Sequence, residues 1–200
     1  MVDASSKPYV TFADYLEAEQ SSDVKHEWFD GAVYAMSRGT PEHARLSARV
    51  VRLVGNALTG DCDVYSSDMM LYISEVKLAT YADGSVVCGP LETITVKKNG
   101  KSLGEGVTNP VVIIEVLSDS TERYDRGDKF EQYEMIPSLR DYVLVSQKKV
   151  RIEHFHRQEE TTWQRRIAGA GERVALASIG CDLEVDRAYL EVFAGSTGAP

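Results

Sequence analysis

The sequence predicts one α/β domain, in which a mixed central β-sheet is flanked by helices and preceded by an N-terminal helix and a β-hairpin. Two hundred residues with 43% hydrophobic and 26% charged content are typical of a globular domain that buries a full core. Strand-like runs rich in Val and Ile alternate with amphipathic segments, as in α/β proteins. We therefore expect residues 1–200 to form a single domain with an ordered core over about 9–193.

The N-terminal third holds two helix signals around one hairpin signal. Thr11 followed three residues later by Asp14 is close to a capping box, so "TFADYLEAEQ" predicts a short helix. "HEWFDGAVYAM" places two strand-like runs around Asp30-Gly31, the dipeptide that favours a type I′ turn. Apolar residues then recur at helical spacing from Pro41 to Leu58, which predicts a long amphipathic helix.

The rest of the chain reads as strands interrupted by one helix. Strand candidates at 63–74, 80–89 and 109–118 predict a β-meander, with a polar loop or hairpin excursion from Glu92 to Gly106. The following segment opens with polar capping residues and ends at a proline, so we expect a helix from about Glu122 to Ile136, weakened at Gly127. The last elements are expected in "RDYVLVS", "KVRIEHFHR", "TTWQRRIAG" and "LEVDRAYLEVF".

The charge balance limits the classes of function. A formal net charge of −9 argues against a protein that mainly coats nucleic acid, because phosphate binding leaves a basic footprint. A metal-dependent nuclease stays open, since it needs only a local basic rim, which Lys and Arg clusters at 97–101, 148–151 and 165–166 would supply. No run approaches the ~20 apolar residues of a membrane span and the N-terminus lacks signal-peptide regions. We therefore expect a cytoplasmic protein without membrane contact.

The three cysteines carry no recognisable pattern. Cys62, Cys88 and Cys181 are odd in number, widely spaced and without a CxxC pair. The spacing predicts core residues, with neither a disulfide framework nor a structural zinc site.

Two acids stand where strands should be apolar. Glu115 lies inside the run "VVIIEVL", where an unpaired buried charge would cost several kcal/mol. Asp83 begins another apolar strand, in "TYADGSVVCG". If the two strands pair, both carboxylates converge at one end of the sheet and bind a hard divalent cation through oxygen. Taken singly, either acid is as well explained by a cap or an ion pair.

A lysine on the next helix completes the set. Asp125, Lys129 and Tyr133 are spaced i, i+4, i+8 and share one stripe of that helix, so Lys129 reaches back towards the strand end. By itself the pattern is better explained by a surface Asp–Lys pair. With the two acids it reads as two metal ligands and a cation that orients water or stabilises charge in a phosphoryl transition state.

The acid, acid, lysine set resembles the PD-(D/E)XK nuclease superfamily, and longer segments are similar to the Uma-two family of restriction-endonuclease-like proteins. These segments are "KHEWFDGAVYAMSRGTPEH", "ADGSVVCG", "NPVVIIEVLSDST", "YDRGDKFEQYEMIPSLRDYVLVSQ" and "VRIEHFHRQ". The resemblance implies a restriction-endonuclease-like core and a phosphodiesterase site that uses Mg²⁺ or Mn²⁺. It defines a reaction class more firmly than a substrate.

The resemblance assigns roles residue by residue. Its two acids fall on Asp83 and Glu115, its lysine falls on Lys129, and the backbone carbonyl of Val116 becomes a further metal ligand. The parent superfamily would carry the lysine two residues after the second acid, where this chain has Leu117. A lysine supplied by the neighbouring helix restores that charge. We expect a Lys129→Met protein to fold normally and to lose cleavage by about 10²-fold.

Three residues depart from the family pattern around the acids. Ala82 replaces a proline, Gly84 replaces a bulky aliphatic residue, and Asp119 replaces a proline in "LSDST". None of these changes removes a ligand, but the first two would loosen the strand that positions Asp83.

Four further residues have weaker assignments. The resemblance makes Glu27 a third, water-mediated metal contact, with a cross-strand ion pair as the alternative. His43 falls on a family histidine near a helix start, where a solvated or capping role is the alternative. His154 and His156 share a strand face but have no third ligand in the sequence, so we expect them to be surface residues.

The sequence thus favours a metal-dependent endonuclease that hydrolyses DNA, with Asp83, Glu115 and Lys129 catalytic and His43, Asp125 and Tyr133 accessory. RNA as a substrate is left open, and symmetric cleavage of a duplex would favour a homodimer. The alternative is an inactive nucleic-acid-binding or oligomeric protein that retains the nuclease fold. The altered "ADG" motif and the acidic net charge support this alternative.

Overall fold

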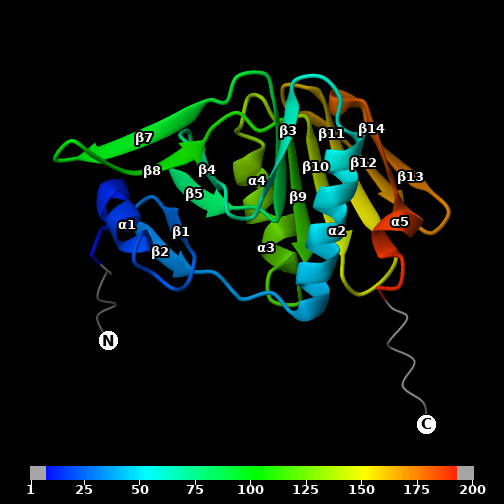
Figure 1. The fold of residues 1–200 in the computed structure, drawn as a ribbon, viewed down its shortest axis with the longest axis horizontal. Coiled ribbons are helices and arrows are strands. Elements are labelled where there is room, and N and C mark those ends of the chain that lie inside the picture. Colours follow the sequence, from blue (N-terminus) through cyan, green and yellow to red (C-terminus); the bar gives the residue numbers. More distant parts are fainter. Residues whose placement is uncertain (1–7, 193–200) are drawn as a thin grey trace, which may run out of the picture.

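Two six-stranded mixed sheets stand side by side in the computed structural model, which describes residues 8–192 (Figure 1). The sheet at the left of Figure 1 is built from segments within residues 26–107, and the sheet at the right from segments within residues 62–168. A two-stranded sheet at the right of Figure 1 packs on one face of the second sheet. The predicted α/β class is therefore confirmed, with a second large sheet in addition to the central one.

The first sheet pairs the N-terminal hairpin with three later segments. In spatial order it consists of β2 (Ala32–Ala35), β1 (His26–Phe29), β5 (Leu78–Tyr81), β4 (Met70–Ile73), β8 (Lys101–Val107) and β7 (Thr93–Lys98). Helix α1 (Phe12–Glu19) covers it through Tyr15 and Leu16, which pack with Trp28 and Leu103.

Both N-terminal signals in the sequence are confirmed. The Thr11 hydroxyl accepts a hydrogen bond from the Asp14 backbone N–H at 3.1 Å and caps α1. Asp30 and Gly31 have φ of 38° and 90°, the left-handed conformations that a type I′ hairpin requires.

The second sheet is the central one. In spatial order it consists of β12 (Thr162–Ala168), β11 (Ile152–Glu159), β10 (Asp141–Ser146), β9 (Val112–Leu117), β6 (Gly84–Cys88) and β3 (Cys62–Ser66). Strands β9 and β10 are parallel, and the other pairs are antiparallel. Every residue of β9 is buried, as its run of branched aliphatic side chains predicted.

The two faces of this sheet pack against different partners. Helix α2 (Pro41–Ala57), helix α5 (Val185–Tyr189) and the small sheet β13 (Arg173–Leu176) with β14 (Cys181–Glu184) cover the face that carries Ile114 and Val116. The face that carries Ile113 and Leu117 packs on the first sheet and on α4 (Asp128–Tyr133). Since side chains alternate along a strand, Glu115 points to this second face, between the two sheets.

The structure corrects one predicted element, confirms the hairpin alternative for another, and divides a predicted helix at its expected weak point. The expected β-meander is wrong, because its strands are divided between the two sheets. The polar stretch after Glu92 forms the β7–β8 hairpin, which turns at Asn99-Gly100. The predicted helix from Glu122 to Ile136 is split by Gly127 into α3 (Glu122–Arg126) and α4, because glycine leaves helical geometry there with φ −118° and ψ −106°.

The cysteine prediction is wrong for two of the three residues. Cys62 of β3 and Cys88 of β6 are directly opposite each other across the strand pair and form a disulfide. Cys181 is a free, buried thiol, as expected. Over residues 8–192, no helix is both long enough and apolar enough to cross a membrane.

Candidate active site

Asp83 and Glu115 meet because their strands are neighbours. Asp83 immediately precedes β6, whose first residue Gly84 is opposite Ile114 of β9. The Val116 backbone N–H donates to Asp83 Oδ2 at 2.7 Å, and the Asp83 backbone N–H lies 3.3 Å from Glu115 Oε2. The two acids that the sequence marked as anomalous therefore lie side by side.

Glu115 is 4% exposed and both of its oxygens have partners. The Tyr133 hydroxyl donates to Oε1 at 2.8 Å, and the Lys129 ammonium lies 2.9 Å from the same oxygen. Leu117, two residues further along β9, is buried in the core between the sheets. The lysine that reaches Glu115 thus comes from α4, as the sequence argument expected.

Lys129 is the positive centre of this cluster. Besides Glu115, its ammonium lies 3.5 Å from Glu27 Oε1 and 3.7 Å from Asp125 Oδ1. Only 4% of the residue is exposed, so the alternative of a surface Asp–Lys pair does not hold. Surrounding carboxylates outweigh the effect of burial, and the pKa of Lys129 is raised well above its usual value.

Glu27 reaches the cluster from the N-terminal hairpin. It lies in β1, and its Oε1 accepts a hydrogen bond from the Thr80 hydroxyl of the adjacent β5. Its ion pair is with Lys129 of α4 rather than with a cross-strand lysine or arginine. The first sheet therefore contributes one carboxylate to a cleft whose other acids come from the second sheet and the α3–α4 segment.

His43 approaches the same acids from the opposite side. It lies in the first turn of α2, where its backbone N–H donates to the capping Thr40 hydroxyl. Its Nε2 is 3.2 Å from Asp83 Oδ2. The hydrogen bond to Asp83 raises the His43 pKa, and the backbone of Val116 adds to the shift. The Asp83 carboxylate and the Val116 backbone thus face one side chain.

The cluster holds more negative than positive charge. Among the side chains that line the cleft, this cluster gathers the carboxylates of Glu27, Asp83, Glu115 and Asp125 around the ammonium of Lys129. Burial raises the pKa of Glu115 to about 8, although Lys129 opposes the shift. Oxygen donors with an excess of negative charge are the environment that Mg²⁺ and Mn²⁺ prefer, so these residues fit a hard divalent cation.

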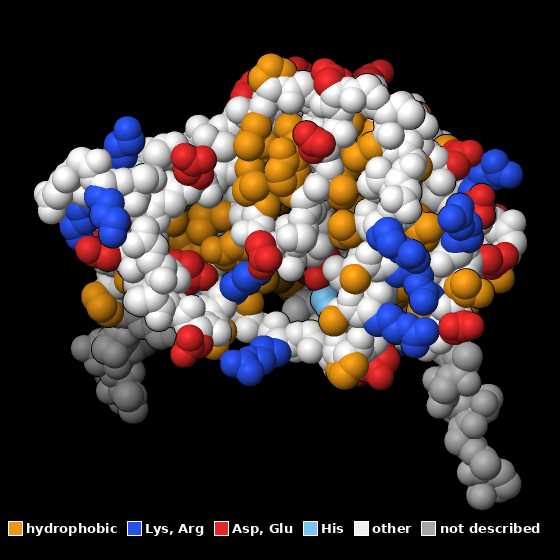
Figure 2. Space-filling view, viewed as in Figure 1, with side chains coloured by type: hydrophobic (Ala, Val, Ile, Leu, Met, Phe, Trp, Pro, Cys, Tyr) orange, Lys and Arg blue, Asp and Glu red, His pale blue; other side chains and the backbone are white. Residues whose placement is uncertain are grey.

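The cleft has a volume of about 870 Å³ and opens between the two sheets. Figure 2 shows this face hollowed, with acidic and basic side chains around the opening. Lys25, Arg38 and the segment from Ser118 to Thr121 also line it. The space is large enough to admit an extended polar chain.

Two of the three residues that depart from the family pattern are buried. Gly84 is buried, and a Cβ built there would lie 2.7 Å from Cγ2 of Val51 in α2. Ala82 is 3% exposed and packs in the core between the sheets. Asp119 forms an exposed ion pair with Lys148 at 2.7 Å. In this chain a side chain of α2 fills the space that a larger residue at 84 would need.

Each basic cluster expected to form a rim has a member that is paired with an acid. Lys98, Lys148 and Arg165 each form salt bridges with acidic side chains. Three arginines of α2 that were not among the predicted basic clusters lie near the cleft. They are Arg45, Arg49 and Arg52, and their i, i+4, i+7 spacing places them on one stripe beside the cleft-lining face of that helix. Figure 2 shows Lys and Arg side chains gathered next to α2.

The expectation that His154 and His156 are surface residues without a third ligand is also wrong. His154 is buried, His156 is half-buried, and both contact Asp141. The sequence does not indicate Asp141 as their partner. It is the first residue of β10, and an acid at that position is ordinarily explained as a residue that ends the strand.

Comparisons with known proteins agree with the resemblance seen in the sequence. Residues 12–188 match the Uma2 (Uma-two) family, described as "Putative restriction endonuclease". Two uncharacterized Synechocystis proteins are similar: slr1290, 38% identical over 91% of this chain and 92% of its own, and sll1609, 33% identical over 82% and 89%.

A solved structure supports the fold. The crystal structure of a "putative nuclease belonging to DUF820" from Anabaena variabilis superposes with a TM-score of 0.67 at 12% identity, covering 86% of this chain and 93% of that one. The expected restriction-endonuclease-like core is therefore confirmed. Because the family match spans most of the chain and slr1290 is 38% identical to it, the chain belongs to the Uma2 family.

Proposed function

We propose that this protein is a divalent-metal-dependent endonuclease that hydrolyses phosphodiester bonds in DNA. The observation that carries the proposal is the convergence of Asp83, Glu115 and Lys129 in one cleft, from three separate segments of the chain. Family membership and the shared fold support the reaction class. DNA and the metal are the finer parts of the proposal and rest on the chemistry of the cleft.

Asp83, Glu115 and the backbone carbonyl of Val116 would hold the cation, with Glu27 a further contact through water. Mg²⁺ or Mn²⁺ in this position supplies a Lewis acid for a phosphodiester oxygen and lowers the pKa of water. The cluster around Lys129 has more carboxylates than ammonium groups. A bound cation would therefore stabilise it by compensating the excess negative charge.

Lys129 orients a water molecule or stabilises negative charge on the phosphoryl oxygens as it develops. Tyr133 donates its hydroxyl hydrogen to Glu115 and fixes that carboxylate, while Asp125 flanks the ammonium. Burial of all three side chains holds the lysine in one orientation. His43 lies against Asp83 and senses pH at the edge of the site.

The arginines of α2 are candidates for contact with the DNA backbone. Arg45 and Arg52 are exposed, and Arg49 donates to the Leu190 carbonyl. They run along the helix that starts in the cleft at His43, so a strand leaving the cleft along α2 would meet successive positive charges. Cleavage of both strands of a duplex needs two such sites, which a cytoplasmic homodimer would provide.

The alternative is a nucleic-acid-binding protein whose site no longer cleaves. Its supporting observation is that Asp83 Oδ2 is already shared by the Val116 N–H and His43. The two functions separate in one assay with plasmid, linear duplex and single-stranded DNA, each with Mg²⁺, Mn²⁺ or EDTA. We expect cleavage by the wild-type protein with metal and none by Asp83→Asn. Binding of DNA without cleavage in every metal would instead support the alternative.

A further inference from the structure

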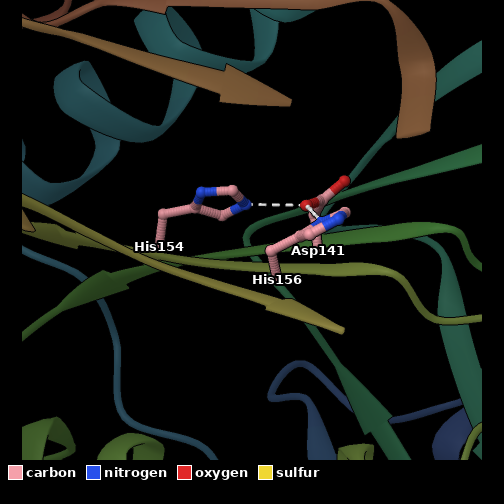
Figure 3. Close-up of side chains that lie close together, drawn as sticks. All are labelled: Asp141, His154 and His156. Atoms are coloured by element: carbon pink, nitrogen blue, oxygen red, sulfur yellow. Dashed lines mark hydrogen bonds and ion pairs between the residues drawn. The ribbon is translucent and has the colours of Figure 1, made fainter. Parts of the chain in front are cut away.

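Asp141, His154 and His156 form a second cluster on the central sheet (Figure 3). Asp141 begins β10 and is opposite His156 of β11, while His154 is opposite Val143, so all three side chains share one face. Asp141 Oδ1 lies 2.7 Å from His154 Nε2 and 2.7 Å from His156 Nδ1. The three donor atoms lie within 4.8 Å of one another.

Asp141 differs from the other buried acids in its partners. Among residues 8–192 the buried acids are Glu115, Asp125, Asp141 and Glu153. Glu115 and Asp125 lie beside Lys129, and Glu153 lies beside three arginines. Asp141 is 0% exposed, and no lysine or arginine of residues 8–192 forms a salt bridge with it. Its compensating charge must come from the imidazoles or from a bound cation.

The hydrogen bonds around Asp141 fix the direction of its carboxylate. His154, His156 and the Ser178 hydroxyl are all hydrogen-bonded to it. Ser178 lies in the 3₁₀ turn η1 (Ala177–Ile179) and donates to Oδ2, which leaves Oδ1 to the two histidines. A carboxylate fixed by a hydroxyl and aimed at two imidazole nitrogens has the arrangement of a supported metal ligand.

This cluster is separate from the proposed nuclease site. Asp141 is three residues before Leu144, which is opposite Glu115, so the two positions are about 10 Å apart along the strands. Odd and even positions alternate, and Asp141 therefore points to the face covered by α2 and the β13–β14 sheet, whereas Glu115 points to the other face. Neither site shares a side chain with the other.

We propose that Asp141, His154 and His156 bind a transition-metal ion of the Zn²⁺ class. Two imidazole nitrogens with one carboxylate oxygen are a three-ligand zinc set, with a fourth position for water. Tetrahedral bonds of about 2.0–2.1 Å separate donors by roughly 3.3 Å, so each nitrogen would move about 0.6 Å from Asp141 Oδ1. The half-buried His156 gives the ion a path from solvent, because 28% of its side chain is exposed.

The ligand types separate the two sites by metal. Imidazole nitrogens suit Zn²⁺, Co²⁺ and Ni²⁺, whereas the carboxylate oxygens of Asp83 and Glu115 suit Mg²⁺ and Mn²⁺. A metal at Asp141 would join β10 and β11 and, through Ser178, hold η1 against the sheet. Binding of this metal would be independent of whether the cleft cleaves DNA.

The test is metal binding to the full chain after stripping with EDTA and dialysis. For the wild-type protein we expect calorimetry to show one bound Zn²⁺ per chain. Zn²⁺ should raise the melting temperature, and bound Co²⁺ should show the visible absorption of a tetrahedral site. His156→Gln should weaken Zn²⁺ binding by at least tenfold. Because His156 is half-buried, this variant should fold, and an unchanged far-ultraviolet circular dichroism spectrum would verify it.

The matched control is His26→Gln, which removes another half-buried imidazole paired with a carboxylate, Glu19, at 2.9 Å in the first sheet. It should bind Zn²⁺ as the wild type does, and so should Asp83→Asn, which separates this site from the nuclease proposal. Absence of Zn²⁺ and Co²⁺ binding in the stripped wild-type protein would overturn the proposal and leave a hydrogen-bonded cluster only. Equal Zn²⁺ affinity of wild type and His156→Gln would overturn it too.

Discussion

Replacing Lys129 by methionine should lower the stability of the protein as well as its cleavage rate. The ammonium lies within 2.9–3.7 Å of Glu115, Glu27 and Asp125, so the variant leaves three carboxylates without their cation. Removing one partner of a buried ion pair costs about 3–5 kcal/mol. For a domain of this size about 2–4 °C are lost per kcal/mol, which gives a fall in Tm of roughly 6–20 °C. The expectation from sequence that folding would be unaffected is thus revised by the burial of Lys129.

The loss of stability should depend on pH. Burial raises the pKa of Glu115 from 4.5 to about 8 with the lysine present, and removing the ammonium raises this pKa further. When folding raises the pKa of a carboxyl group, the folded protein loses stability as the pH rises from the unfolded-state pKa of that group through its folded-state pKa. The difference between variant and wild type should therefore be small near pH 5 and largest above pH 8, in thermal melts with EDTA.

Lys148→Met is the control for this experiment. Lys148 lies 2.7 Å from Asp119, but 56% of its side chain is exposed, so its loss should leave Tm nearly unchanged. Added Mg²⁺ should restore part of the stability of Lys129→Met, because a cation replaces the missing positive charge. Equal melting temperatures of Lys129→Met and wild type at pH 8.5 in EDTA would refute the reasoning.

Three further predictions concern Glu115, His43 and the disulfide. Glu115→Gln removes the carboxyl group whose pKa is raised. The Tm of this variant minus that of the wild type should therefore be larger at pH 8.5 than at pH 5.5 in metal-free buffer. An equal difference at the two pH values would contradict this. The Mg²⁺ concentration for half-maximal cleavage should rise several-fold from pH 8 to pH 6, because Asp83 raises the His43 pKa and the imidazolium repels the cation. In His43→Asn the rise should be smaller, and an equal rise would count against that role. Reducing the disulfide of Cys62 and Cys88, which are 26 residues apart, should lower the unfolding free energy in urea by about 3 kcal/mol, whereas a Cys62→Ser, Cys88→Ser protein should not respond to reductant.

Local signals in the sequence predicted local structure well. Thr11 and Asp14 predicted the cap of α1, and Asp30-Gly31 predicted the hairpin, because each depends on residues close in the chain. The branched aliphatic run around Glu115 predicted a strand buried on both faces. The position of Glu115 in that run was also the strongest indication of a site.

Features that depend on strand register could not be predicted. The disulfide requires Cys62 and Cys88 to be directly opposite, and the Asp141 cluster requires β10 and β11 to pair with Asp141 opposite His156. Neither spacing in the chain indicates such a pairing. The pairing of the β7–β8 hairpin with β4, through Leu71, is likewise set by the tertiary packing of the first sheet.

The proposed function requires Asp83 and Glu115 to hold a hard divalent cation beside Lys129. An anomalous difference map from crystals soaked in Mn²⁺ would locate that cation. We expect a peak about 2.0–2.6 Å from carboxylate oxygens of both acids and from the Val116 carbonyl oxygen. If fully soaked crystals with the cleft open to solvent show no peak at these oxygens, the two acids do not hold the cation and the proposed function is wrong.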